Sequence, residues 1–280
     1  MTVVYRQSSI TYHPNHPFNI MYPSSPSPST DPRIDLHLRF STNKQGMAPW
    51  FLKQIELPAD ANVLELGCGS CNFWLVNYSS IPQGWHITLT DSPASKYSEA
   101  QRILSQDRGF TFHTVDPATP LPFDTASLDA VITLHLLNRL ENISAALKEI
   151  HRVLKPGGKL YAAAYGEKHM DELYFLFLRF NPQIASISGR LPGNWKFSLE
   201  NGTRQLREFF WDVQIRRYED ALEITEAKPL FDYILTMSGI SPNTENQEGL
   251  YSLAAFISQE IIEKGSIHIT KSEGVLIATK

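Results

Sequence analysis

Apolar and polar residues along positions 62–165 form short apolar runs separated by amphipathic stretches. Five of these runs are rich in branched and aromatic residues, which favours strands. The five predicted strands are Asn62–Leu66, His86–Thr90, Phe110–Val115, Leu128–Leu134 and Leu160–Tyr165. Strands that alternate with helices are typical of a parallel, doubly wound α/β sheet. Two later runs, Asp212–Tyr218 and Gly274–Thr279, complete a seven-stranded, mostly parallel sheet whose last strand is expected to be antiparallel.

The clearest helical pattern lies between the fourth and fifth strands. Apolar residues of Ile143–Val153 recur at helical spacing, so that one face of the predicted helix is apolar. We expect this helix to end at Lys155–Gly158, because proline cannot continue a helix and glycine permits a left-handed turn. Further helices are expected from the turn after the first strand to Tyr78, and over Ser95–Ser105.

Composition narrows the class of protein. The 280 residues carry a formal net charge of −4, with a pI near 6.1, whereas a dedicated nucleic-acid binder usually has a strong basic excess. Residues 1–33 contain six prolines and many serines, which predicts a flexible arm. No apolar run approaches the roughly 18 residues that span a bilayer. Cys68 and Cys71 are the only cysteines and make no disulfide framework, so we expect a cytoplasmic protein without a membrane span.

The segment richest in chemical information follows the first predicted strand. Glu65–Asn72 reads Glu-Leu-Gly-Cys-Gly-Ser-Cys-Asn and places two glycines between a buried strand and a helix start. Such glycines let the backbone approach a ligand closely, and free helix N–H groups favour a negative group. Asn72 stands where the dinucleotide fingerprint has its third glycine, which disfavours a pyrophosphate and a nicotinamide dehydrogenase. Asp91 ends the second strand, where a carboxylate can bind a ribose diol, so we expect a nucleoside ligand without a diphosphate.

Several motifs occur together in the order found in one enzyme family. They are Val63–Asn72, Asp91, Leu121–Asp124, Leu128–Ile132 and Ile150–Gly158. These motifs resemble the class I S-adenosylmethionine-dependent methyltransferases, and within them the small-molecule group that includes the ubiquinone and menaquinone methyltransferases. The resemblance covers residues 60–165. It implies a Rossmann-like methyltransferase fold, S-adenosyl-L-methionine as the cofactor and an enzyme that methylates a small molecule.

The resemblance also implies which residues contact the cofactor. They are Glu65, Gly67, Cys68, Gly69, Asn72, Asp91, Ser92, Asp116, Pro117 and Leu134, the last of which would face the sulfonium. Asp91 would hold the ribose hydroxyls, and Ser92 and Asp116 would lie beside the adenine. The sequence departs from the family pattern at Asp116, which stands one residue further from Leu121 than is usual, and at Arg139, where a second histidine is frequent.

A general base assists methyl transfer to a hydroxyl, a phenol or an acidic carbon, and histidine is the usual choice. His135, at the end of the fourth strand, is the first candidate for a catalytic base, and His169, just past the fifth strand, is the second. A histidine at a strand end can also be a hydrogen-bonded structural residue. No metal site is expected.

The residues outside the resemblance should form the acceptor site. Residues 166–211 are rich in aromatic side chains and are expected to form an inserted helical lid over an apolar or aromatic acceptor. Alternatively, these aromatic residues are simply the core face of a helix. With the lid, we expect a single methyltransferase domain over 34–280. It comprises the cofactor-binding core 60–165, the lid 166–211, and C-terminal strands and helices over 212–280.

Three functions fit the sequence. The leading one is S-adenosylmethionine-dependent methylation, at oxygen, nitrogen or carbon, of a small apolar or aromatic metabolite by a monomer or homodimer that binds no nucleic acid. The second is an RNA or protein methyltransferase with the same cofactor domain, against which the acidic pI counts. The third is a non-catalytic cofactor-binding protein, against which the intact glycine turn and Asp91 count.

Overall fold

A computed structural model describes residues 31–91, 102–106, 109–117, 120–181, 195–239, 241 and 247–280. These residues divide into two compact units. The core unit consists of the described residues within Gln45–His169, Leu191–Glu219 and Lys271–Lys280, and the accessory unit consists of those within Met1–Lys44, Met170–Arg190 and Asp220–Thr270. Most of the predicted arm 1–33 and much of the predicted helix Ser95–Ser105 lie outside the described residues.

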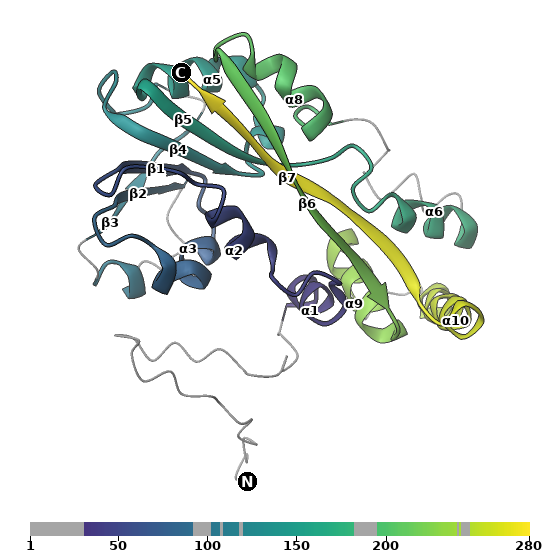
Figure 1. Ribbon diagram of the computed structural model, residues 1–280. Coiled ribbons are helices and arrows are strands. Elements are labelled where there is room, and N and C mark those ends of the chain that lie inside the picture. Colours follow the sequence, from purple (N-terminus) through teal and green to yellow (C-terminus); the bar gives the residue numbers. More distant parts are fainter. Residues whose placement is uncertain are drawn as a thin grey trace. The chain divides into compact units, whose positions relative to one another are not determined.

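The described residues form one seven-stranded sheet in the order β3-β2-β1-β4-β5-β7-β6 (Figure 1). Its strands are β1 (Asn62–Leu66), β2 (His86–Asp91), β3 (Phe110–Thr114), β4 (Leu128–Leu134), β5 (Leu154–Tyr165), β6 (Asp212–Ile224) and β7 (Ile267–Thr279). Strands β1 to β5 run parallel, and β7 is antiparallel to β5. The predicted mostly parallel sheet is therefore confirmed. The chain order reverses between β1 and β4, so their carboxyl ends flank the point where such sheets bind ligands.

Helices of the core unit cover both faces of the sheet. Its helices are α2 (Met47–Leu52), α3 (Asn72–Asn77), α5 (Ile143–Val153) and α8 (Leu199–Leu206), with short 3₁₀ turns at η1 (Tyr78–Ser80) and η2 (Leu137–Arg139). Successive residues of a strand point to opposite faces, so Val63 packs with Trp74 of α3 whereas Leu64 packs with Ile150 of α5. Figure 1 shows α2 and α3 on one face of the sheet and α5 and α8 on the other.

Strand β5 begins earlier than the sequence predicts. The helix α5 ends at Val153 as expected, but Leu154 already pairs with Leu128 of β4. The next pair is Ala130 with Lys159, so the proline and glycines between them bulge out of the strand instead of closing a separate turn. The predicted turn at Lys155–Gly158 is thus an irregular part of β5.

Strands β6 and β7 are both longer than predicted. Each continues into the accessory unit, where alternate residues such as Leu222 and Ile269 are fully buried. Along each strand, polar residues such as Thr270 alternate with the buried ones, so neither extension forms a continuous apolar run in the sequence.

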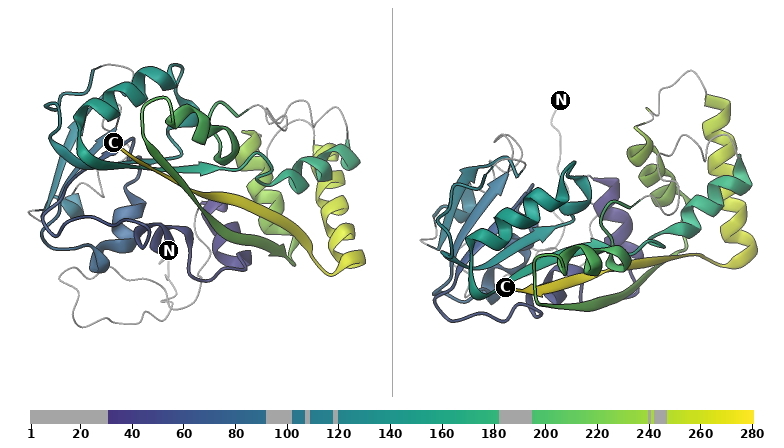
Figure 2. Two further views of the ribbon diagram at one scale, coloured as in Figure 1. Left: turned by 45° about the horizontal axis from the view of Figure 1, so that its top comes forward. Right: turned by 90° about the horizontal axis from the view of Figure 1, so that it is seen from above.

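The accessory unit has its own apolar core. Its helices are α1 (Pro32–Phe40), α6 (Asp171–Phe180), α9 (Ala227–Ser238) and α10 (Gln247–Lys264). Helix α9 lies against both α1 and α10 (Figure 2). Asp31 caps α1 by accepting a hydrogen bond from the Arg33 N–H, and Pro32 fits the first turn, where a helix needs no N–H donor. Among the helices of the described residues, none is both long and apolar enough to cross a bilayer.

The predicted lid, 166–211, lies within the described residues except for 182–194, and its described part is divided between the two units. Phe177 of α6 belongs to the apolar cluster of the accessory unit. Phe197 and Phe210, on either side of α8, are buried against the sheet in the core unit. These aromatic residues therefore have structural partners, and a lid function for the segment stays a prediction.

Candidate functional site

The glycine turn after β1 folds against the end of β2. The N–H groups of Gly67 and Cys68 both donate to the carbonyl of Thr90, each at 2.9 Å. Gly67 and Gly69 have φ angles of +73° and +55°, which glycine adopts without steric cost, and Cys71 shares this left-handed conformation at +54°. Helix α3 then begins at Asn72. The turn between strand and helix is thus held by backbone bonds and by glycines at positive φ.

Asp91 lies next to this turn. Its Oδ2 atom accepts a 2.9 Å hydrogen bond from the Gly69 N–H. A Cβ atom placed on Gly69 would meet no atom of the described residues within 4 Å, so the space above the turn is open. Ser92, the next predicted cofactor residue, lies outside the described residues. The structure therefore brings the glycine turn and the acid of β2 together beside an open space.

Glu65 is completely buried. Its Oε2 atom accepts a hydrogen bond from Nε1–H of Trp74, while Oε1 has no hydrogen-bond partner among the described residues. Burial raises the pKa of Glu65 to about 8, and the nearby charge of Asp91 acts in the same direction. A cationic group that reached Oε1 would satisfy this atom and favour the ionised carboxylate.

The two cysteines of the turn are free thiols. Their sulfur atoms lie 3.2 Å apart, and both side chains are buried. The hydrogen bond that the protonated Cys68 thiol shares with Cys71 and its buried surroundings raise the pKa of this thiol. A buried thiol that stays protonated is a poor nucleophile, so the pair packs the turn as small apolar residues do.

Asp116 and Pro117 follow β3. The N–H of Val115, just before them, donates to the carbonyl of Asp91 at 3.2 Å, so the chain leaving β3 is bonded to the end of β2. The structure thus places Asp116 and Pro117 just after the strand that pairs with β2, which ends at Asp91.

His135 directly follows Leu134, the last residue of β4. Its backbone is in the left-handed region, at φ +55°, and its N–H donates to the carbonyl of Ala163 in β5. The Nδ1 atom is buried and has no hydrogen-bond partner among the described residues. Burial, together with the charges of Arg139 and Lys271, lowers the pKa of His135 to about 4. The imidazole is therefore neutral at neutral pH.

Both predicted histidines belong to one aromatic stack. The ring of Tyr165, the last residue of β5, lies 4.0 Å from the His135 ring at an interplanar angle of 13°, and 4.1 Å from the ring of His169. Nδ1 of His169 is 3.0 Å from the carbonyl oxygen of Ser272. A carbonyl only accepts hydrogen bonds, so Nδ1 carries the proton in this bond, and Nε2 is the basic nitrogen of the neutral ring.

Strand β7 contributes two charged residues that sequence reasoning missed. Nζ of Lys271 is 3.0 Å from Oε1 of Glu273, and Glu273 stands opposite Tyr165 in the β5–β7 register. Both side chains are more than nine-tenths buried. The predicted seventh strand begins only at Gly274, so it does not include these two residues. The alternation of polar and apolar residues before Gly274 was the signal that could have found them.

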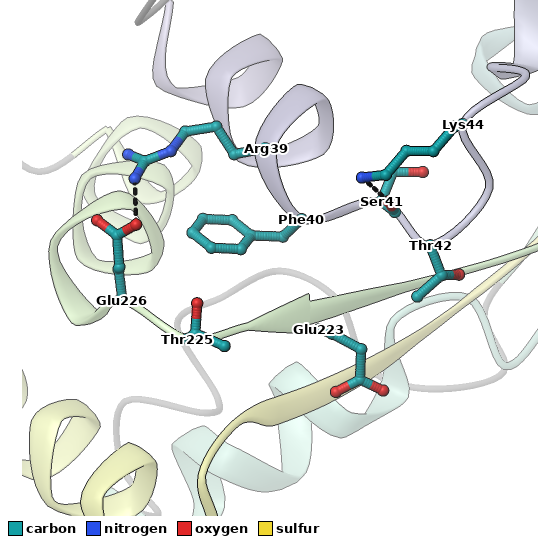
Figure 3. A pocket seen from close by; sticks show the side chains of 8 residues that line it. All are labelled: Arg39, Phe40, Ser41, Thr42, Lys44, Glu223, Thr225 and Glu226. Atoms are coloured by element: carbon teal, nitrogen blue, oxygen red, sulfur yellow. Dashed lines mark hydrogen bonds and ion pairs between the residues drawn. The ribbon is translucent and has the colours of Figure 1, made fainter. Parts of the chain in front are cut away.

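A pocket of about 450 Å³ lies in the accessory unit, and its lining includes none of the predicted site residues (Figure 3). Its lining residues are Arg39, Phe40, Ser41, Thr42, Lys44, Glu223, Thr225 and Glu226. The cations are already engaged: Arg39 pairs with Glu226, and Nζ of Lys44 donates to the Ser41 carbonyl. Glu223 binds Ser266 and His268. The lining is thus a set of paired charges that favours neither an anion nor a cation.

Part of the core unit is similar in sequence to known methyltransferases. Residues 64–162 match a family model described as a methyltransferase domain. The mitochondrial 2-methoxy-6-polyprenyl-1,4-benzoquinol methylase of Mus musculus is 31% identical over 93 residues, which are 33% of this chain and 28% of that protein. A tRNA N(3)-cytidine methyltransferase of Gallus gallus is 29% identical over 150 residues, which are 49% of this chain and 40% of that protein. The chain thus spans less than half the length of these two relatives.

The fold has a counterpart among crystal structures. The YcgJ protein from Bacillus subtilis superposes with a TM-score of 0.55 at 14% sequence identity, and the match covers 83% of this chain and 97% of that one. At this level of identity, the likeness extends to the fold alone.

Proposed function

We propose that this chain, which carries a class I methyltransferase domain, transfers the methyl group of S-adenosylmethionine to a small molecule. The observation that carries the proposal is the pair of features around the glycine turn: a buried Glu65 oxygen without a partner among the described residues, and an open space above Gly69. An ammonium group would satisfy the carboxylate, and a backbone turn without side chains admits a close ligand. The methionine end of S-adenosylmethionine carries an ammonium group.

The proposed cofactor contacts follow the edge of the sheet. Glu65 and the turn from Gly67 to Asn72 would hold the methionine end, and Asp91 would accept hydrogen bonds from the ribose hydroxyls. Ser92, Asp116 and Pro117 would surround the adenine, and Leu134 would lie near the sulfur. When bound, the cofactor supplies an electrophilic methyl group. The protein's part is to hold the acceptor in line with that group and to exclude water.

Either histidine of the stack is proposed as the base that takes a proton from the acceptor. His135 is uncharged above about pH 4, which leaves a lone pair on the imidazole at neutral pH, but the lowered pKa makes it a weaker base than an ordinary histidine. Nε2 of His169 is basic because Nδ1 donates to Ser272. The ring of Tyr165 lies against both imidazoles, stacked on His135 and tilted by 32° to His169. His135 follows Leu134 directly, so we place it first.

The cofactor is tested by calorimetric titration of the full chain with S-adenosylmethionine, S-adenosylhomocysteine and NAD. Micromolar binding of the first two, without binding of NAD, is expected. Transfer of a labelled methyl group is then measured with a panel of phenols, apolar acids and amines. Binding of NAD alone would overturn the proposal.

A second candidate function is methylation of RNA, which the partial similarity to the tRNA methyltransferase favours. The formal net charge of −4 counts against it, because RNA binding depends largely on neutralising phosphates. Including tRNA in the labelled-methyl assay at low salt separates the two functions: incorporation into tRNA, with none into the small molecules, would favour the second.

A further inference from the structure

We propose that Lys271 binds an anionic oxygen of the methyl acceptor and that Glu273 positions the lysine for this contact. The anionic oxygen would belong to a carboxylate or to a deprotonated hydroxyl. This inference rests on the proposed function, since it assumes that an acceptor binds at the carboxyl ends of β4 and β5. Lys271 then selects among acceptors and takes no part in bond making.

The register of β7 brings the pair to the face of the sheet that carries the proposed cofactor site. Residues two apart on a strand share a face, so Lys271 and Glu273 point to the same side as Val275. Val275 and Leu134 belong to one apolar cluster, on the side of α3. Glu273 also stands opposite Tyr165, the last residue of β5. The ion pair therefore lies at the same edge as the histidine stack.

Packing alone does not account for these charges. The side chains of Lys271 and Glu273 are only 9% and 7% exposed. A buried ion pair loses most of its hydration, and its replacement by apolar residues of similar volume is often neutral or stabilising. A buried ion pair is therefore weak evidence of a purely structural role, whereas recognition of a charged ligand requires the lysine itself.

One aromatic ring lies near the ammonium group, and a second ring packs against the first. Nζ of Lys271 lies 5.7 Å from the centre of the Tyr218 ring, and that ring is 5.3 Å from the ring of Trp50. His135, whose ring stacks on Tyr165, is close enough to feel the charge of Lys271. Ring faces next to a cation suit a planar acceptor that carries its negative oxygen on or beside a ring.

The test measures the preference of the full chain for anionic over neutral ring compounds. Titration with S-adenosylhomocysteine comes first, and the saturated protein is then titrated with benzoate against benzamide and with 4-nitrophenolate against 4-nitroanisole, at a pH where both acids are ionised. We expect at least a tenfold preference for the anion in one of the two pairs, equivalent to about 1.4 kcal/mol. Preference in the first pair identifies a carboxylate, and preference in the second identifies a deprotonated hydroxyl.

The informative variant changes both partners, Lys271→Met with Glu273→Gln, because removal of the lysine alone would leave a carboxylate buried without its cation. This double variant should lose the preference for anions while its affinity for the neutral compounds changes less than twofold. Lys271→Arg should keep the preference, and so should the control Lys228→Met, at a lysine of the accessory unit that is 82% exposed.

Two results would overturn the inference: wild-type protein that does not prefer the anion in either pair, and a double variant that keeps the wild-type preference. Failure of S-adenosylhomocysteine to bind would instead count against the proposed function. In that case the same titrations with anionic and neutral ring compounds, run without S-adenosylhomocysteine, still test whether Lys271 binds an anion.

Discussion

The N–H of Gly69 donates a 2.9 Å hydrogen bond to Oδ2 of Asp91. This bond connects the turn after β1 to the last residue of β2, two segments that the sequence presents as separate motifs. It orients the carboxylate beside the turn before any ligand binds. A ligand held by both segments would therefore meet a preorganised site, which lowers the ordering cost of binding.

Replacement of Asp91 by alanine should weaken the binding of S-adenosylhomocysteine at least tenfold, or by about 1.4 kcal/mol. The change removes the proposed partner of the ribose hydroxyls and also the acceptor for the Gly69 N–H. Asp91→Asn keeps an oxygen that can accept the Gly69 bond, so it should retain more affinity than alanine. Isothermal titration calorimetry measures both variants, and an alanine variant with wild-type affinity would remove the ribose assignment.

Gly69→Ala should lose cofactor affinity while keeping the fold. The new Cβ would enter the open space above the turn, where the cofactor is proposed to lie, and the φ of +55° costs an alanine about 1 kcal/mol of stability. Gly239→Ala is the matched control, because its φ of +65° is also positive and its Cβ would also meet nothing within 4 Å, but it caps α9 in the accessory unit. Similar melting temperatures with a larger loss of affinity in Gly69→Ala are expected. Equal affinities would contradict a ligand above Gly69.

Glu65 should make the stability of the free protein fall as the pH rises. The folded pKa, about 8, lies above the usual value of 4.5, so between these two values the folded state binds the proton more tightly. The contribution of Glu65 to the free energy of unfolding is therefore fully present below pH 4.5 and is lost as the pH rises towards 8. Glu65→Gln removes this dependence, so its stability relative to wild type should grow over that range by on the order of 4 kcal/mol, since a tenfold change in proton affinity is worth about 1.4 kcal/mol.

Urea unfolding of both proteins at several pH values, without cofactor, measures this difference. A constant difference between pH 5 and pH 8 would show that Glu65 is ionised in the folded protein. Trp74→Phe provides a related check, because loss of the indole N–H removes the hydrogen bond that favours the ionised carboxylate. That variant should bind the proton on Glu65 still more tightly than wild type.

Local sequence patterns predicted the sheet core because the deciding interactions are local there. The span Ile143–Val153 was predicted for α5 because its apolar face follows helical spacing. The glycine turn was equally visible, since positive φ favours glycine at positions 67 and 69. The start of β5 was missed because Pro156 and the following glycines are typical of a turn, and only pairing with β4 makes the segment a bulged strand.

The state of the site residues depends on partners that are distant in the sequence. His135 was predicted from its place after β4, but its neutral form follows from burial and from the charges of Arg139 and Lys271. From the sequence, Tyr165 is only the last residue of the fifth predicted strand, because nothing local shows that two histidine rings lie against it. Lys271 and Glu273 were missed for the same reason: their role depends on the β5–β7 register.

His135→Ala should reduce turnover at least tenfold while the affinity for S-adenosylhomocysteine changes less than twofold, because a base at this position acts on the acceptor. The pH–rate profile of the wild-type protein should show no inflection near pH 6.5 from His135, since the pKa of this histidine in the folded protein is about 4. Stability should decline as the pH falls from 6.5 towards 4, where the unfolded state binds a proton that the folded state excludes, and alanine should abolish this decline. His86→Ala, at an exposed histidine on β2, is the control for both measurements. Full turnover in His135→Ala would transfer the role of base to His169.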